Sequence, residues 1–181
     1  MKQIVASLAV ALGVVACGGG SAGSGEWANT FDGPGDDLFL VDDDFVCLAD
    51  SRYDVVGRSR VWNALGRQDQ AVEHARSGAI GEYPVGTVIQ LFPSEASVKR
   101  GSGFSPETGD WEFFVLDVDS GTTRIAERGT TGIANIGGTC LSCHGGASAF
   151  DYACFSNTGC GALPFFIDTD VQPEEDDPRC R

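Results

Sequence analysis

Hydrophobic and polar residues alternate with a period of two along much of the second half of the chain. Residues 87–92, Thr-Val-Ile-Gln-Leu-Phe, follow this pattern and end at Pro93, so they predict a strand. Residues 111–118 predict a second strand, and residues 119–121, Asp-Ser-Gly, predict a turn into a third strand over 122–127. The 111–118 strand is largely apolar on both faces, so we expect it to be buried on both sides.

The first half of the chain predicts one strand and one helix. Residues 53–62 favour a strand with an irregularity at Gly57. Residues 65–77 place apolar side chains at helical spacing, and Gly78 follows as a stop signal. His74 would lie away from the apolar side of this helix and face solvent. Together these elements predict an α+β fold, a single domain with a mainly antiparallel β-sheet and one or two packed helices.

The N-terminal residues have the pattern of an export signal. Residues 1–16 carry a lysine near the start and then a short apolar run, which is typical of a signal peptide and too short to span a bilayer. The run ends in Val-Val-Ala before Cys17, which resembles a bacterial lipobox, so Cys17 is expected to be lipid-modified; the alternative is cleavage nearby that leaves Cys17 as a spare thiol. We expect a lipidated tether and irregular lead-in over 17–44, and the folded domain over 45–181.

These features predict an exported lipoprotein on the periplasmic side of a bacterial membrane, with the lipid as its only membrane contact. The formal net charge of −14 argues against nucleic acid and anionic lipid surfaces as partners, and it would suit a basic redox partner protein. The acidic runs at 42–44 and 174–177 could dock such a partner; the alternative is that they are solvated faces.

The strongest chemical signal is the run of five residues Cys140-Leu-Ser-Cys143-His144. Two thiols at this spacing can bind the two vinyl groups of one porphyrin, and the next residue places an imidazole under the iron, so the motif predicts one covalent haem c. The alternatives are a Cys140–Cys143 disulfide, a thioredoxin-like pair or half of a zinc site. A zinc site needs a second ligand pair, and the only other histidine, His74, has no cysteine near it in sequence.

Four cysteines remain once Cys17 and the haem pair are assigned, and an oxidising compartment favours two disulfides among them. Three pairings are possible. We favour a local Cys154–Cys160 bridge and a long Cys47–Cys180 bridge that ties the tail to the start of the domain.

The order of these parts resembles a known family. A Pro-x-Gly-Thr-Val turn at 84–88, a Gly-Asp-Trp-Glu-Phe-Phe strand at 109–114 and one late Cys-x-x-Cys-His motif are similar to the cytochrome P460 and cytochrome c′-beta family, over about residues 53–155. The resemblance implies an antiparallel sheet with packed helices, the motif histidine as proximal ligand, an open or apolar distal side and a homodimer. With the doubly apolar strand, it suits a sheet covered by a helix on one face and by haem on the other.

Members of that family divide by one distal strand residue. P460 proteins cross-link a lysine to the haem, and the matching position here is Leu91, whereas Lys99 lies outside that strand. An apolar residue resembles the c′-beta type, which binds gases such as NO. Arg60 falls near the family's distal arginine; a surface salt bridge is the alternative role.

The only methionine is Met1, so this chain cannot supply His/Met coordination once its signal peptide is removed. We therefore expect a monohaem protein with an open, apolar distal side that binds or oxidises a small nitrogen species, NO or hydroxylamine. Whether it is a P460-like oxidoreductase is left open. The alternatives are a membrane-tethered electron-transfer cytochrome c and a haem-free lipoprotein stapled by disulfides.

Overall fold

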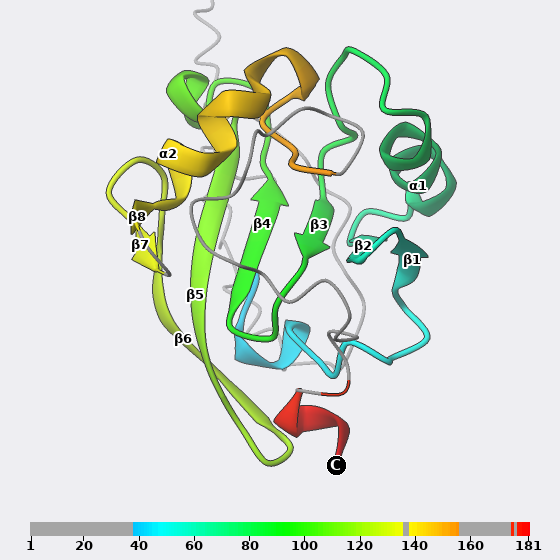
Figure 1. Cartoon of the computed structure of the whole chain (residues 1–181), viewed down its shortest axis with the longest axis vertical. Coiled ribbons are helices and arrows are strands. Elements are labelled where there is room, and N and C mark those ends of the chain that lie inside the picture. Colours follow the sequence, from blue (N-terminus) through cyan, green and yellow to red (C-terminus); the bar gives the residue numbers. More distant parts are fainter. Residues whose placement is uncertain (1–37, 136–137, 156–174, 176) are drawn as a thin grey trace, which may run out of the picture.

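The computed structural model of the chain describes residues 38–135, 138–155, 175 and 177–181. Within these residues a six-stranded sheet has the order β1-β2-β3-β4-β5-β6, and each strand pairs antiparallel with the next one in sequence (Figure 1). The predicted α+β class is thus confirmed. The strands are β1 (Asp54–Val56), β2 (Ser59–Asn63), β3 (Thr87–Gln90), β4 (Glu95–Lys99), β5 (Trp111–Asp119) and β6 (Thr122–Gly129).

Two α-helices and several short elements complete the described part of the chain. A two-stranded ladder, β7 with β8, leads directly into α2. The α-helices are α1 (Gln68–Ser77) and α2 (Cys140–His144). The short elements are β7 (Ala134–Asn135), β8 (Gly138–Thr139) and the 3-10 turns η1 (Asp42–Asp44), η2 (Pro106–Thr108), η3 (Gly145–Phe150) and η4 (Pro178–Cys180). None of the described helices is long and apolar enough to cross a bilayer.

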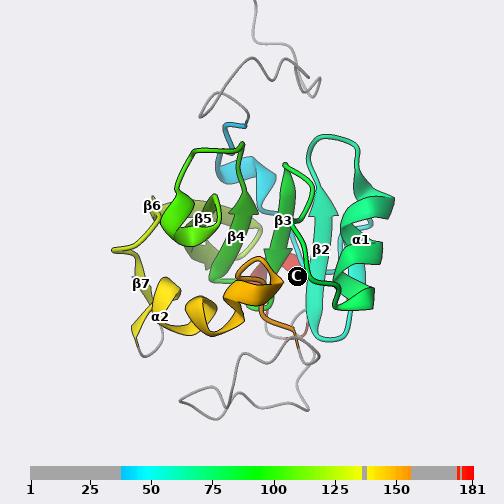
Figure 2. The same cartoon turned by 90° about the horizontal axis from the view of Figure 1, so that it is seen from above.

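Side chains alternate along each strand, so the sheet has two different buried faces. On the helix face, Trp111 and Phe113 pack with Val61 and with Ala71 and Val72 of α1. Cys140 of α2 packs against the same cluster. Figure 2 shows α2 and η3 on the opposite side of the sheet from residues 38–48.

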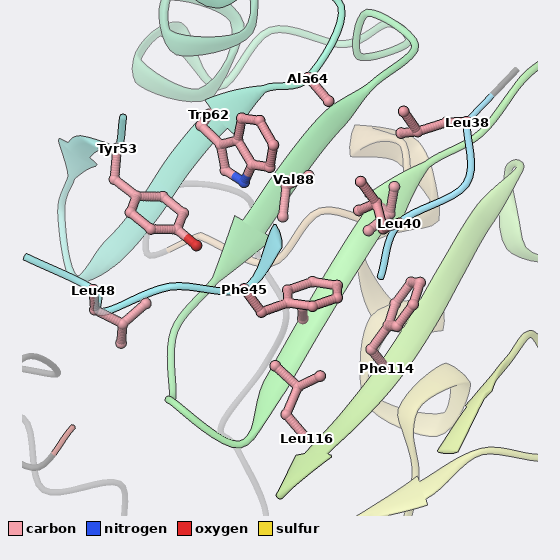
Figure 3. Close-up of a cluster of buried hydrophobic side chains, with 12 residues drawn as sticks. Leu38, Leu40, Phe45, Leu48, Tyr53, Trp62, Ala64, Val88, Phe114 and Leu116 are labelled. Carbon is pink, nitrogen blue, oxygen red and sulfur yellow. The ribbon is translucent and has the colours of Figure 1, made fainter. Parts of the chain in front are cut away.

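The other face, the lead-in face, is covered by residues 38–48. Phe45 lies 5.1 Å from Phe114 between ring centroids, and Leu40 packs into the same cluster (Figure 3). The predicted burial of β5 on both sides is therefore confirmed. α1 and the Cys140–His144 motif share one face of the sheet, and residues 38–48 of the same chain cover the other. The motif is therefore not on the face opposite the helix, where the sequence placed haem.

Two residues of the predicted lead-in belong to the core, because Leu38 and Leu40 are 6% and 1% exposed. Residues 26–44 are rich in Gly and Asp, so the sequence pattern does not mark these two leucines as core residues. Acidic residues here also have structural roles. Asp44 is buried and accepts a hydrogen bond from the Val41 N–H at 2.7 Å, whereas Asp42 and Asp43 are exposed.

Three predicted element boundaries also differ. Residues 53–62 form the hairpin β1–β2, since Gly57 takes a left-handed φ of +59° and turns the chain. The helix begins at Gln68 instead of residue 65, because the Asn63 side chain accepts the Leu65 N–H at 2.9 Å and Gly66 has a φ of +75°.

The strand predicted over 87–92 ends at Gln90. Residues 91–94 turn the chain into β4, and the Glu95 N–H donates to the Phe92 carbonyl at 3.3 Å to close this turn. The hairpin over residues 119–121 is confirmed, with Gly121 at a φ of +71°.

The long disulfide Cys47–Cys180 is present, which confirms that predicted pairing. Polar contacts support it on the same side of the domain. Asp177 is fully buried and accepts the Leu48 N–H at 3.0 Å, while the Arg179 guanidinium donates to the Phe45 carbonyl at 3.0 Å. Asp177 therefore anchors the tail, although the sequence placed it in an acidic docking run or a solvated face.

Candidate functional site

Helix α2 consists of the motif itself, residues Cys140–His144. Thr139 caps it, since its hydroxyl accepts the Ser142 N–H at 3.2 Å. Residues three and four apart lie on neighbouring positions of a helix surface, so one turn brings Cys140, Cys143 and His144 to one side. Both thiols are free and partly buried, so the structure does not contain the alternative Cys140–Cys143 disulfide.

The Cys140 thiol is held in its protonated form. Burial raises its pKa to about 11, and the negative charges of Glu95 and Glu127 act in the same direction. A thioredoxin-like cysteine needs the opposite, a thiol whose pKa is lowered. This environment argues against the redox-pair alternative.

The His144 ring is fixed at two places. Its Nδ1 lies 2.8 Å from the carbonyl oxygen of Tyr152, and its ring centroid lies 4.9 Å from that of Phe113 in β5. Burial lowers the pKa of the imidazole, so the ring is neutral at neutral pH. A neutral ring that donates Nδ1–H to a carbonyl keeps its lone pair on Nε2, which is the tautomer that binds a metal ion.

The carbonyl that holds His144 belongs to an unusual turn. Asp151 and Tyr152 are consecutive and both have left-handed backbones, with φ of +53° and +58°. Such conformations cost free energy for residues with a side chain and persist only where their surroundings hold them. The Tyr152 N–H donates to the Ala147 carbonyl at 3.0 Å, and the Asp151 carboxylate accepts the Tyr83 N–H at 2.8 Å.

Asp151 is buried and paired with Lys99 of β4. The Lys99 ammonium lies 2.7 Å from Asp151 Oδ1 and donates to the Gly109 carbonyl at 2.7 Å. Desolvation raises the pKa of Asp151, while Lys99 and the Tyr83 N–H lower it. The net direction is upward, so burial of this carboxylate costs more than its partners restore.

Gly109 gives this turn the space it needs. A Cβ at Gly109 would meet the Tyr152 ring at 2.7 Å, and its φ of +62° disfavours any side chain. Gly121 has a similar φ of +71°, but a Cβ there would meet nothing within 4 Å. The two positions therefore separate backbone strain from a clash with Tyr152.

Gly109→Ala should lower the free energy of unfolding by more than Gly121→Ala does. Each substitution places alanine in a left-handed backbone, at a cost of about 1–2 kcal/mol, and overpacking against Tyr152 should add about 1–3 kcal/mol at Gly109 alone. Urea unfolding of both variants measures the difference. Equal losses would mean that Tyr152 moves aside freely and that the turn is not held in place.

The distal candidates do not gather at the motif. Arg60 is 2% exposed in β2, and its guanidinium donates to the Arg58 carbonyl at 3.2 Å. It pairs in register with Gln90 and lies beside Trp62, so alternation puts it on the lead-in face, away from Phe113. Because its side chain is buried, Arg60 is not the surface residue that the alternative interpretation expected.

Leu91 lies in the turn just after β3 and is partly buried. His74 is not turned to solvent as predicted, because its ring packs against Tyr83 with centroids 4.3 Å apart. Cys154 is disulfide-bonded, but Cys160 lies outside the described residues, so the Cys154–Cys160 pairing stays a prediction. Cys17 lies outside the described residues as well.

Sequence reasoning missed Asp151 and Tyr152, and it considered Lys99 only as a poorly placed iron ligand or cross-linking lysine outside the distal strand. The sequence held one signal for Lys99, which ends a run of alternating residues typical of a strand. A lysine is rarely fully buried without a partner, so a lysine at this position should be either exposed or paired with a carboxylate. Among the described residues no cluster of three or more His, Cys, Asp or Glu side chains could hold a metal ion, which gives the zinc alternative no support.

Comparison of the chain with protein-family models, curated proteins and solved structures finds no match.

Proposed function

We propose that this chain is a c-type monohaem protein, with the haem attached through Cys140 and Cys143 and its iron bound by His144. The observation that carries the proposal is the hydrogen bond from His144 to the Tyr152 carbonyl, beside two free thiols on the same helix. Iron-binding histidines need such a partner on the other ring nitrogen. When bound, haem supplies a redox-active iron with a coordination position for a small molecule.

Apolar side chains next to α2 suit a porphyrin. Phe113 contacts the His144 ring, and Ile133 and Phe155 pack against the same cluster as Cys140. These apolar side chains would pack against the flat apolar part of a porphyrin.

Lys99 and His74 are the described residues considered for the sixth coordination position of the iron, and both are engaged elsewhere. The Lys99 amine is engaged by Asp151 and by the Gly109 carbonyl. His74 belongs to α1, which lies over β1 and β2, whereas α2 lies toward the β5–β6 end of the sheet (Figures 1 and 2). We therefore propose a five-coordinate iron that binds a small neutral ligand such as NO.

Oxidation of hydroxylamine through a lysine cross-link is disfavoured by the same contacts. A cross-link would have to break the Lys99–Asp151 pair and leave the Asp151 carboxylate buried alone. Leu91 is partly buried in the turn just after β3, and an apolar distal residue at this position stays part of the proposal. Export and lipid anchoring through Cys17 complete it and rest on the N-terminal sequence.

The test is the spectrum of the full chain made in a host that attaches haem c. One haem per chain by the pyridine haemochrome assay, a high-spin ferrous spectrum and a shift with NO and CO are the expected results. The double variant Cys140→Ala, Cys143→Ala is the control and should bind no covalent haem. A wild-type chain without a Soret band would leave the haem-free lipoprotein, and a low-spin ferrous spectrum with sharp α and β bands would leave the electron carrier.

A further inference from the structure

The Lys99–Asp151 ion pair is among the most deeply buried charges of the described residues. The Lys99 side chain is 4% exposed and the Asp151 side chain is 5% exposed. It joins β4 to the turn that follows η3, fifty-two residues apart. Two more contacts complete it, from Lys99 to the Gly109 carbonyl and from the Tyr83 N–H to Asp151. Replacing such a pair with apolar residues is often neutral or stabilising, so stability alone does not explain it.

The pair acts on one backbone segment. Asp151 is the first of the two left-handed residues, and its two carboxylate oxygens are each held by a different element. The next residue, Tyr152, presents its carbonyl to His144 at 2.8 Å. Without the Asp151 anchors this turn could relax to an ordinary conformation, and the Tyr152 carbonyl would move.

We propose that Lys99 and Asp151 are positioning residues for His144: they hold the Tyr152 carbonyl against Nδ1 and so set the orientation and basicity of the iron ligand. This inference rests on the proposed haem function. A histidine that donates Nδ1–H to a well-placed carbonyl is the more basic ligand, and a more basic ligand favours ferric over ferrous iron. Loss of the anchor should therefore raise the reduction potential.

The test variant is Lys99→Met, which removes the ammonium and keeps the length of the side chain. Its control is Arg100→Met, at the adjacent residue. Arg100 pairs with Glu112, both 6% exposed, and Arg128 also binds Glu112 at 2.7 Å. The control therefore breaks a comparable buried pair at a different carboxylate, that of Glu112 in β5.

Both variants should be less stable to urea, and only Lys99→Met should change the iron. We expect its reduction potential to become more positive and the iron–histidine stretching frequency of the ferrous protein to fall, with one covalent haem per chain retained. Asp151→Asn keeps the shape of the side chain and loses one acceptor, so it should shift both readouts in the same direction by less. It serves as the second variant where Lys99→Met does not fold.

The outcomes separate the two proposals. A wild-type chain that binds no haem overturns the proposed function and this inference with it. A haem-loaded wild type whose potential and stretching frequency are unchanged in the Lys99 and Asp151 variants overturns the inference alone, because the ion pair would then only stabilise the fold. Equal shifts in Arg100→Met would also overturn it.

Discussion

Replacing His144 by alanine should abolish the native ferrous coordination while the attached haem stays bound to the chain. In the proposed haem site, attachment would use the two thiols of α2 and coordination would use the imidazole, so the two properties separate at one residue. The variant also removes the contact with Phe113 and the hydrogen bond to Tyr152. The measurement is the absorption spectrum of oxidised and reduced protein, beside the haem content per chain.

The chain offers a matched control, because it has only one other histidine. His74→Ala removes a partly buried imidazole of α1 that packs against Tyr83. It should cost some stability and leave the ferrous spectrum unchanged. A wild-type spectrum in His144→Ala would show that His144 does not bind the iron. A changed spectrum in His74→Ala would indicate that His74 of α1 is an iron ligand, against the proposal.

The features that could be predicted from sequence are local ones. The strand β5 is apolar at every position from Phe113 to Leu116, and the Asp-Ser-Gly turn follows directly, so its burial on both faces and its hairpin were both predicted. The motif at Cys140–His144 is likewise contained in five consecutive residues. Counting the cysteines left after other assignments gave three possible pairings, and the favoured one contains the Cys47–Cys180 bridge that the structure has.

The features that could not be predicted depend on contacts between distant segments. Leu38 and Leu40 lie in a stretch rich in Gly and Asp, and only the open apolar face of the sheet makes them core residues. The anchoring of Asp151 needs the Tyr83 N–H, 68 residues away, and Lys99, 52 residues away. No periodicity along the chain contains that information, so the support of His144 becomes visible only in the structure.

The same reasoning applies to Arg60. Its place in β2 was close to the predicted strand, but the face that Arg60 takes is seen only from the pairing of β2 with β3, where Arg60 lies opposite Gln90. A shift of one residue in a strand moves every side chain to the other face. A distal role could not be assigned to Arg60 from its sequence position alone, and its position on the lead-in face argues against one.

Removing the long disulfide should cause the largest loss of stability. The bridge joins residues 133 apart, and closing a loop of this length contributes about 5 kcal/mol in the chain-entropy model. The double variant Cys47→Ser, Cys180→Ser removes it without leaving a free thiol. Urea unfolding of wild type and variant measures the loss, which should be about 4–5 kcal/mol if the reduced unfolded chain retains little structure.

The proposed haem site should be insensitive to that loss. The bridge fastens the C-terminal tail to the segment that covers the lead-in face, while α2 lies on the helix face. Asp177 and Arg179 still bind Leu48 and Phe45 in the variant, so the tail has polar anchors of its own. We therefore expect an unchanged spectrum in the folded variant together with a much lower urea midpoint. A loss below about 1 kcal/mol would mean that these polar contacts, and not the bridge, hold the tail against the lead-in segment.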